Sequence, residues 1–229
     1  MRAVCLLALV AASATAQPRP LDRVADALGG ADRFDALTAV RLTSRAVLTL
    51  DGQTVRTRTR VTLALPAVAR IDVTLDGAER RVILDEEAAV SVVGAEVRQI
   101  PEAHLPQTWN AVWHLPVALL ARRAEVAAEV LTPSLLRVLP PGAEPFLLRL
   151  DEDGRPDLLT QETADGRYVA VQFSDYREVG GLSLPHRTEQ AVDGIVTGVV
   201  TLARVDLDPV LGDDTFAVPR PAADERVAD

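Results

Sequence analysis

The chain has 229 residues, of which 48% are hydrophobic and 25% are charged, enough apolar material for a globular domain with its own core. This composition excludes a disordered, collagen-like or coiled-coil chain. All 24 basic residues are arginines, and 33 acidic residues give a net charge of -9, so no general attraction to nucleic acid is expected. Because lysine is absent, the sequence also lacks the residue that P-loop NTPases and Schiff-base enzymes require.

The first residues have the features of a secretory signal peptide. Arg2 provides a positive start, 3–12 is apolar, and Ala14 and Ala16 frame a cleavage site. We therefore predict a signal peptide over 1–16 and a periplasmic protein, with secretion to the outside as the alternative. The only cysteine, Cys5, falls inside this signal, so the mature chain has no disulfide or thiolate site. No later apolar run is long enough for a transmembrane segment.

Helical spacing comes first and then gives way to strand alternation. Apolar residues recur at helical intervals from Leu21 to Leu28, Gly29 and Gly30 end that helix, and a second short helix is predicted over 31–37. From 38 to 65 apolar and polar residues alternate on both sides of an Asp-Gly turn, which predicts a long hairpin. Further antiparallel strands are predicted over 70–75, 81–84, 88–93 and 97–100.

A helical insertion separates two groups of strands. Residues 107–128 show no alternation and are predicted to be helical, with Pro116 dividing the segment. Strand patterns return over 135–139, 146–150, 158–162, 168–173, 184–191 and 195–208. With neither repeat nor linker visible, we predict one domain over 17–219 and a flexible tail over 220–229. The order of elements predicts a mainly β (α+β) fold, an incomplete antiparallel β-barrel of about ten strands with an N-terminal helix and a helical lid.

The histidines and the one serine motif do not form a catalytic pattern. His104, His114 and His186 are too widely spaced for a metal-binding motif. The segment from Gly181 to Pro185 matches a nucleophile elbow except at its last position, where the motif requires glycine and a following helix. We therefore predict neither a metal site nor a serine hydrolase.

Two acidic segments are interpreted as turns. Carboxylates at Asp151, Asp153, Asp157 and Glu162 have the spacing of a calcium loop, but Pro156 occupies the position that needs glycine. The run over 85–87 offers adjacent carboxylates and is explained by a charged turn between two strands. The prediction is a protein that is not an enzyme and carries no cofactor.

Two sets of side chains are candidates for binding. Inward apolar positions of the first strands, together with two tryptophans four residues apart on one helix face, either form a packed core or line a lipid-accessible cavity. The predicted ligand contacts are Leu42, Leu48, Val61, Leu63, Ile71, Val73, Trp109, Trp113 and Leu120. The outward positions of the first two strands form either a solvated face or a docking strip for lipid headgroups or an acidic partner. Its residues are Arg41, Arg45, Arg56, Arg58 and Arg60.

Several local patterns, in this order, resemble the LolA/LolB-like periplasmic lipoprotein-carrier superfamily and the related lipid-sensing domain of RseB. They begin with Leu65-Pro66, the strand that contains Arg70-Ile71, and Val82-Ile83-Leu84-Asp85 followed by Pro101. They continue with 148–154, with 173–185 and with the terminal segment 214–219. Together they span nearly the whole mature chain.

The resemblance implies a half-barrel whose apolar concave face takes the acyl chains of a lipoprotein or lipid. It also implies transport across the periplasm from an inner-membrane releasing complex to an outer-membrane acceptor. Carriage needs no catalytic residue, because burial of acyl chains contributes about 0.8 kcal/mol per methylene. The alternative is an envelope sensor or scaffold of the same fold, which acts through protein contacts along the arginines.

Overall fold

A computed structural model describes residues 19–50, 52–66, 68–85 and 88–218. Short helices occupy two places in the chain, at its start and in its middle. They are α1 (Pro20–Ala27), α2 (Ala31–Asp35), the 3₁₀ turn η1 (Glu102–His104), α3 (Leu105–Trp113) and α4 (Pro116–Ala121). Within the described ranges, no helix has both the length and the apolar composition needed to span a bilayer.

All other regular structure is β. The first group of strands is β1 (Ala39–Leu50), β2 (Gln53–Ala64), β3 (Val68–Leu75), β4 (Ala78–Leu84), β5 (Ala89–Val93) and β6 (Glu96–Gln99). The second group is β7 (Ala127–Thr132), β8 (Leu135–Leu139), β9 (Phe146–Leu150), β10 (Pro156–Glu162), β11 (Tyr168–Val179), β12 (Leu182–Val192) and β13 (Ile195–Leu207).

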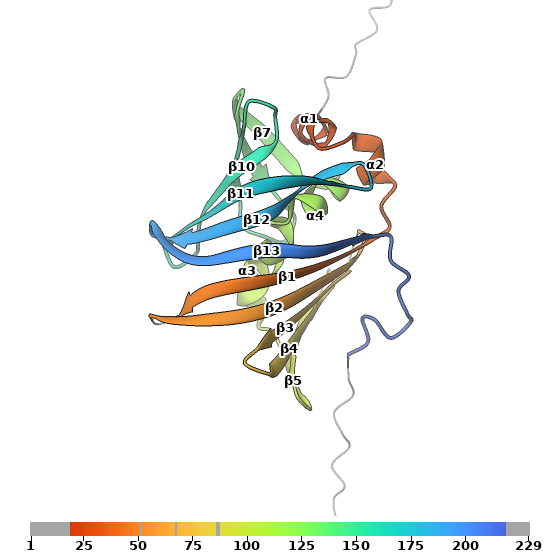
Figure 1. Ribbon diagram of the computed structural model, residues 1–229, viewed down its shortest axis with the longest axis vertical. Helices are drawn as coiled ribbons and strands as arrows, with labels where there is room; N and C mark the ends of the chain where they lie inside the picture. Colours follow the sequence, from red (N-terminus) through yellow and green to blue (C-terminus); the bar gives the residue numbers. More distant parts are fainter. Residues whose placement is uncertain (1–18, 51, 67, 86–87, 219–229) are drawn as a thin grey trace, which may run out of the picture.

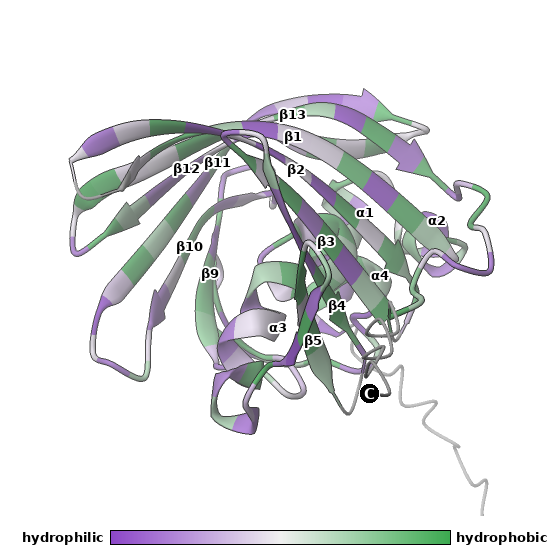
Figure 2. Ribbon diagram, turned by 90° about the horizontal axis from the view of Figure 1, so that it is seen from below, coloured by the Kyte–Doolittle hydropathy of each residue, from purple (hydrophilic) through white to green (hydrophobic). Residues whose placement is uncertain are grey.

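One antiparallel sheet contains every strand. Its order is β6-β5-β4-β3-β2-β1-β13-β12-β11-β10-β9-β8-β7. Each strand therefore pairs with its sequence neighbours, except that β6 and β7 do not pair with each other and that β1 also pairs with β13. That single long-range pairing, β1 with β13, joins the two groups into a continuous sheet. The sheet bends into an arch (Figure 1 and Figure 2). It does not close into a barrel, because its two edge strands, β6 and β7, do not pair.

The helices lie on the concave side of this arch. Figure 2 shows α1, α3 and α4 beneath the sheet, whose crest is formed by β13, β1 and β2. The N-terminal helices are held at one end of β12, where Ser183 N–H donates to the Leu28 carbonyl at 2.8 Å. Gly29 makes this approach possible, because its φ is +120° and a Cβ there would lie 2.2 Å from the Gly181 carbonyl oxygen.

The core fills the space between the helices and the inner face of the sheet. Its largest fully buried side chains include Trp113, Phe34, Leu21, Leu120 and Leu148, which come from both groups of helices and from the sheet. At about 25 cal/mol for each Å² of apolar surface removed from water, burial of such side chains is the main favourable contribution to folding. The helical insertion is therefore part of the core as well as a cover for the sheet.

The predicted fold class is confirmed, with two corrections. Over the described residues the sheet has thirteen strands instead of about ten. The helical prediction over 107–128 was too long, because α4 ends at Ala121 and β7 already occupies Ala127–Thr132. The segment of β7 is rich in alanine and mostly exposed, so it lacks the alternation that marks the other strands. The predicted signal peptide over 1–16 and the tail over 220–229 lie outside the described residues.

Candidate functional site

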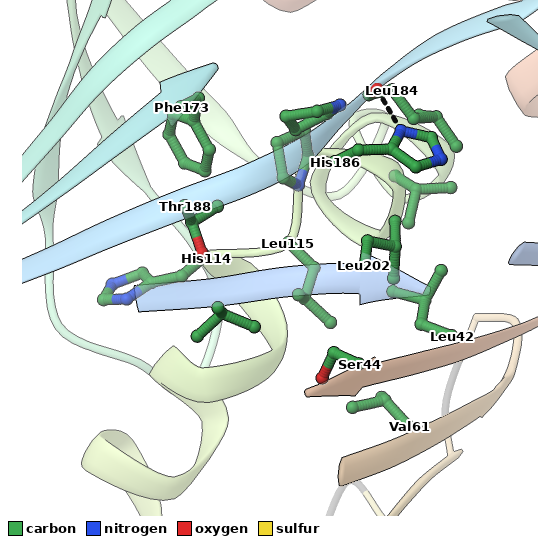
Figure 3. A pocket seen from close by; sticks show the side chains of 14 residues that line it. Leu42, Ser44, Val61, His114, Leu115, Phe173, Leu184, His186, Thr188 and Leu202 are labelled. Carbon is green, nitrogen blue, oxygen red and sulfur yellow. Dashed lines mark hydrogen bonds between the residues drawn. The ribbon is translucent and has the colours of Figure 1, made fainter. Parts of the chain in front are cut away.

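An apolar cleft opens between the inner face of the sheet and the corner that joins α3 to α4 (Figure 3). Its volume is about 90 Å³. We call this space the inner cleft. Five strands and the α3–α4 corner contribute its lining, which is Leu42, Ser44, Val61, His114, Leu115, Pro116, Val117, Phe173, Leu184, Pro185, His186, Thr188, Val200 and Leu202.

Strand register brings residues that are distant in sequence to this place. Leu42 of β1 stands opposite Val61 of β2, and two residues on, Ser44 stands opposite Leu202 of β13. Directly opposed residues in an antiparallel pair project from the same face of the sheet, with Cβ atoms about 4.5–5.5 Å apart. The pairing of β1 with β13 therefore sets the lining of the cleft.

A sharp corner in the chain forms the opposite wall. The α3 helix ends at Trp113, Leu115 is extended, and Pro116 begins α4 at a position where proline needs no hydrogen-bond partner. The amide of His114 still donates to the Asn110 carbonyl, at 2.9 Å, so the corner remains fixed to the last turn of α3. Leu115 and Pro116 consequently face the sheet across the cleft.

Few polar groups border the cleft. His186 is buried, and its Nδ1 lies 2.9 Å from the Leu184 carbonyl oxygen. Burial lowers the pKa of His114 to about 4, with only a partial offset from the Gln161 side chain, so His114 is neutral at neutral pH. Its ring meets Phe146 edge-on with centroids 5.4 Å apart. The site therefore offers a mainly apolar surface.

The structure distributes the nine predicted ligand contacts over the cleft, the core and other parts of the sheet. Leu42 and Val61 line the inner cleft. Four others belong to the packed core: Leu63, Trp109, Trp113 and Leu120. Ile71 is half-buried at the edge of that core. Of the remaining two, Leu48 covers Gly198, where an added Cβ would approach Leu48 Cδ2 to 2.6 Å, and Val73 is half-buried on β3.

Two adjacent arginines after α4 are buried, although sequence reasoning assigned neither a role. The Arg122 guanidinium lies 4.4 Å from the ring centroid of Trp113 and pairs with Glu125 at 2.7 Å. Arg123 is 6% exposed and binds Asp22 of α1 at 2.7 Å and Asp35 of α2 at 2.8 Å. Arg123 thus links the N-terminal helices to the end of α4. A pair of arginines directly after an apolar helix was the only sequence signal for this arrangement.

The five predicted docking arginines lie on β1 and β2, on the side opposite the cleft-lining residues of those strands. Because side chains alternate along a strand, Arg41 and Arg45 project away from the face that holds Leu42 and Ser44. In register, Arg45 stands directly opposite Arg58. We call this group the outer arginine strip, and its residues are Arg41, Arg45, Arg56, Arg58 and Arg60. Among the described residues, none of the five has an ion-pair partner within 4.0 Å.

In the described part of the chain, no three His, Cys, Asp or Glu side chains gather as a metal site would require.

The arched sheet, the helices on its concave side and the apolar cleft between them together define a LolA-like fold. Solved structures with the same arrangement support this assignment of the fold. A LolA superfamily protein from Nitrosomonas europaea superimposes with a TM-score of 0.63 at 12% identity, covering 87% of this chain and 96% of that one.

Two further solved structures share the fold. A DUF1329 family protein from Desulfovibrio piger gives a TM-score of 0.59 at 13% identity and covers 87% of this chain and 98% of that one. A candidate outer membrane lipoprotein-sorting protein domain from Vibrio parahaemolyticus gives 0.56 at 11% identity, with coverages of 82% and 93%. No family model matches the sequence, and no curated protein matches it either. At these identities the likeness establishes the fold alone.

Proposed function

We propose that the inner cleft binds the acyl chains of a lipid or lipoprotein. The observation that carries this proposal is the cleft itself: side chains such as Leu42, Leu115 and Leu202 face an open space from both sides. Transfer of acyl methylenes from water into such a space contributes about 0.8 kcal/mol each. The hydroxyl groups of Ser44 and Thr188 are available to a carbonyl of the ligand.

The size of the cleft limits how a ligand enters. A volume of about 90 Å³ holds only a short segment of an acyl chain. A longer chain would run along the concave face, past Leu48, Ile71 and Val73, or would displace the corner at Leu115 and Pro116. In this proposal Leu42 and Val61 touch the ligand, while the two tryptophans and Leu120 remain in the packed core.

The biological role that fits best is a non-enzymatic periplasmic carrier that delivers lipoprotein or lipid toward the outer membrane. The LolA-like fold and the signal-peptide pattern support this role. An inner-membrane releasing complex would load the cleft and an outer-membrane acceptor would empty it. Release then needs only an acceptor that binds the acyl chains more tightly than the cleft does.

A second candidate role is an envelope sensor or scaffold of the same fold. The outer arginine strip favours it, because unpaired guanidinium groups on an exposed face suit a protein contact. In this role the cleft would stay empty or hold a regulatory lipid. The two roles differ in whether the protein carries acyl cargo stoichiometrically.

Native mass spectrometry of the mature protein, isolated gently from the periplasm, tests the carrier role. We expect adducts with the mass of a lipid or an acylated peptide, and solvent extraction should release the same species. A cleft-filling variant, Ser44→Phe, should lose the adducts, while Thr49→Phe on the exposed side of the same strand should retain them. Protein that emerges free of adducts and also refuses added phospholipid would contradict acyl-chain binding.

A further inference from the structure

The outer arginine strip gathers five arginines on two paired strands, and none of the five has an acidic partner among the described residues. Strands β1 and β2 together contain five arginines and neither aspartate nor glutamate. On other strands an arginine and a carboxylate two residues apart share one face and form an ion pair. Examples are Arg204 with Asp206 at 2.7 Å and Arg177 with Asp175 at 2.6 Å. On β1 the equivalent position between Arg41 and Arg45 is occupied by Thr43.

The arrangement of the strip opposes folding. Arg45 and Arg58 are directly opposed across the β1–β2 pair. Like charges at directly opposed positions destabilise a sheet, and a single threonine or glutamate would remove the repulsion. A local cost in stability of this kind is typical of a functional site, so the cluster is a candidate for binding through its charge.

The strip also borders two hollows on the convex face of the arch, and Arg58 lines both of them. In the first hollow Arg58 is joined by Arg45, Arg56 and Arg187, with Asp76 as the one carboxylate. Arg187 is already paired with Glu189 at 3.2 Å.

In the second hollow Arg58 is joined by Arg60, Arg70 and Arg81, together with the carboxylates of Asp72 and Glu79. Burial raises the pKa of Asp72, but the guanidinium groups of Arg70 and Arg81 outweigh it and hold that pKa below its usual value. Asp72 is thus committed to these two partners. The hollows leave guanidinium groups free to bind carboxylates from outside.

We propose that the outer arginine strip docks an acidic segment of another protein, whose aspartate and glutamate side chains enter the two hollows. The contact that would form already occurs elsewhere in the protein, where the Arg149 guanidinium donates to both carboxylate oxygens of Asp157. Discrete hollows on a convex face match projecting carboxylates better than the plane of a bilayer. The strip and the inner cleft lie on opposite faces of β1 and β2, so partner and cargo can be bound together.

The proposal is independent of the function of the cleft and is tested with synthetic peptides. Fluorescence anisotropy would measure binding of a labelled peptide of alternating Glu and Ser, with a Gln and Ser peptide as the neutral probe. We expect the strip variant, with Arg45→Gln, Arg56→Gln and Arg58→Gln, to bind the acidic peptide at least about tenfold more weakly. The matched control, with Arg149→Gln, Arg167→Gln and Arg177→Gln, changes net charge equally but removes paired arginines. The affinity of this control for the acidic peptide should stay within about twofold of that of the unmodified protein.

Stability provides a second readout that separates docking from a structural role. Because the strip variant removes a repulsion, its unfolding midpoint in urea should equal or exceed that of the unmodified protein. If both variants bound the acidic peptide equally weakly, the effect would be explained by net charge alone, and the proposal would be overturned. Binding to vesicles containing phosphatidylglycerol, without binding to the acidic peptide, would overturn it in favour of a membrane. Self-association that the strip variant abolishes would overturn it in favour of a second copy.

Discussion

The two halves of the concave face have similar apolar side chains and different packing. Around Trp113 the helices and the sheet are in full contact, and Trp113 is only 1% exposed. Around Leu42 the sheet and the α3–α4 corner stand apart and leave the inner cleft. The difference arises from the corner at Leu115 and Pro116, where the chain turns and no large side chain fills the gap. Apolar composition alone therefore does not determine whether a surface becomes packed core or the wall of a cleft.

The largest effect is expected on the packed side. Trp113→Ala should lower the free energy of unfolding by about 4 kcal/mol, because it removes a fully buried indole and its contact with the Arg122 guanidinium. Urea denaturation followed by circular dichroism measures this loss. A loss below about 1 kcal/mol would mean that the helices are not packed on the sheet as described.

His114, which lies between the packed half and the cleft, should make the free energy of unfolding depend on pH. Burial lowers the pKa of His114 to about 4, against about 6.5 in the unfolded chain, so the unfolded state binds more protons between these values. The contribution of neutral His114 to the free energy of unfolding is fully present above pH 6.5. It is lost as the pH falls toward 4, to a maximum of about 3 kcal/mol. Denaturation midpoints across this range test it, and His114→Gln should flatten the curve. An unchanged slope in His114→Gln would assign the dependence to other groups.

Arg123 links the N-terminal helices to the end of α4, and its loss should have an intermediate effect. Arg123→Met should cost about 2 kcal/mol, because it leaves the carboxylates of Asp22 and Asp35 without their partner while preserving much of the side-chain volume. Hydrogen exchange should show faster opening of α1 and α2 than of the central strands. Uniform acceleration across the sheet would argue against this local link.

The smallest effect is expected at the cleft. Leu202→Ala should lower the free energy of unfolding by only about 1 kcal/mol, because the Leu202 side chain already faces open space. By contrast, Leu120→Ala in the core should cost about 3 kcal/mol, since it creates a new cavity. Equal losses, again from urea denaturation, would show that the inner cleft is packed in solution.

Local patterns were sufficient to predict much of the fold. Alternation on both sides of residues 51–52 predicted the long β1–β2 hairpin, and helical spacing ending at Gly29 predicted α1. The same reasoning missed β7, because an exposed, alanine-rich edge strand has little apolar alternation to detect. Local order and resemblance together indicated the half-barrel, and of the thirteen strands among the described residues only β7 has no predicted counterpart.

The site was harder to predict than the fold, for a physical reason. Leu42 and Val61 were predicted as ligand contacts, but half of the cleft comes from Phe173 and the last two strands. Their place beside β1 depends on the β1–β13 pairing, which joins opposite ends of the chain and has no local signature. The buried arginines after α4 were missed because a charged side chain is normally expected at the surface.

The most direct test of the account is a titration of the mature protein with a fluorescent fatty acid such as cis-parinaric acid, in parallel for three proteins. The account predicts saturable binding to the unmodified protein and to Thr49→Phe, and weakening of at least about tenfold in Ser44→Phe, with all three equally folded. Equal binding by all three, or no binding by the unmodified protein, would contradict the assignment of the inner cleft as the ligand site.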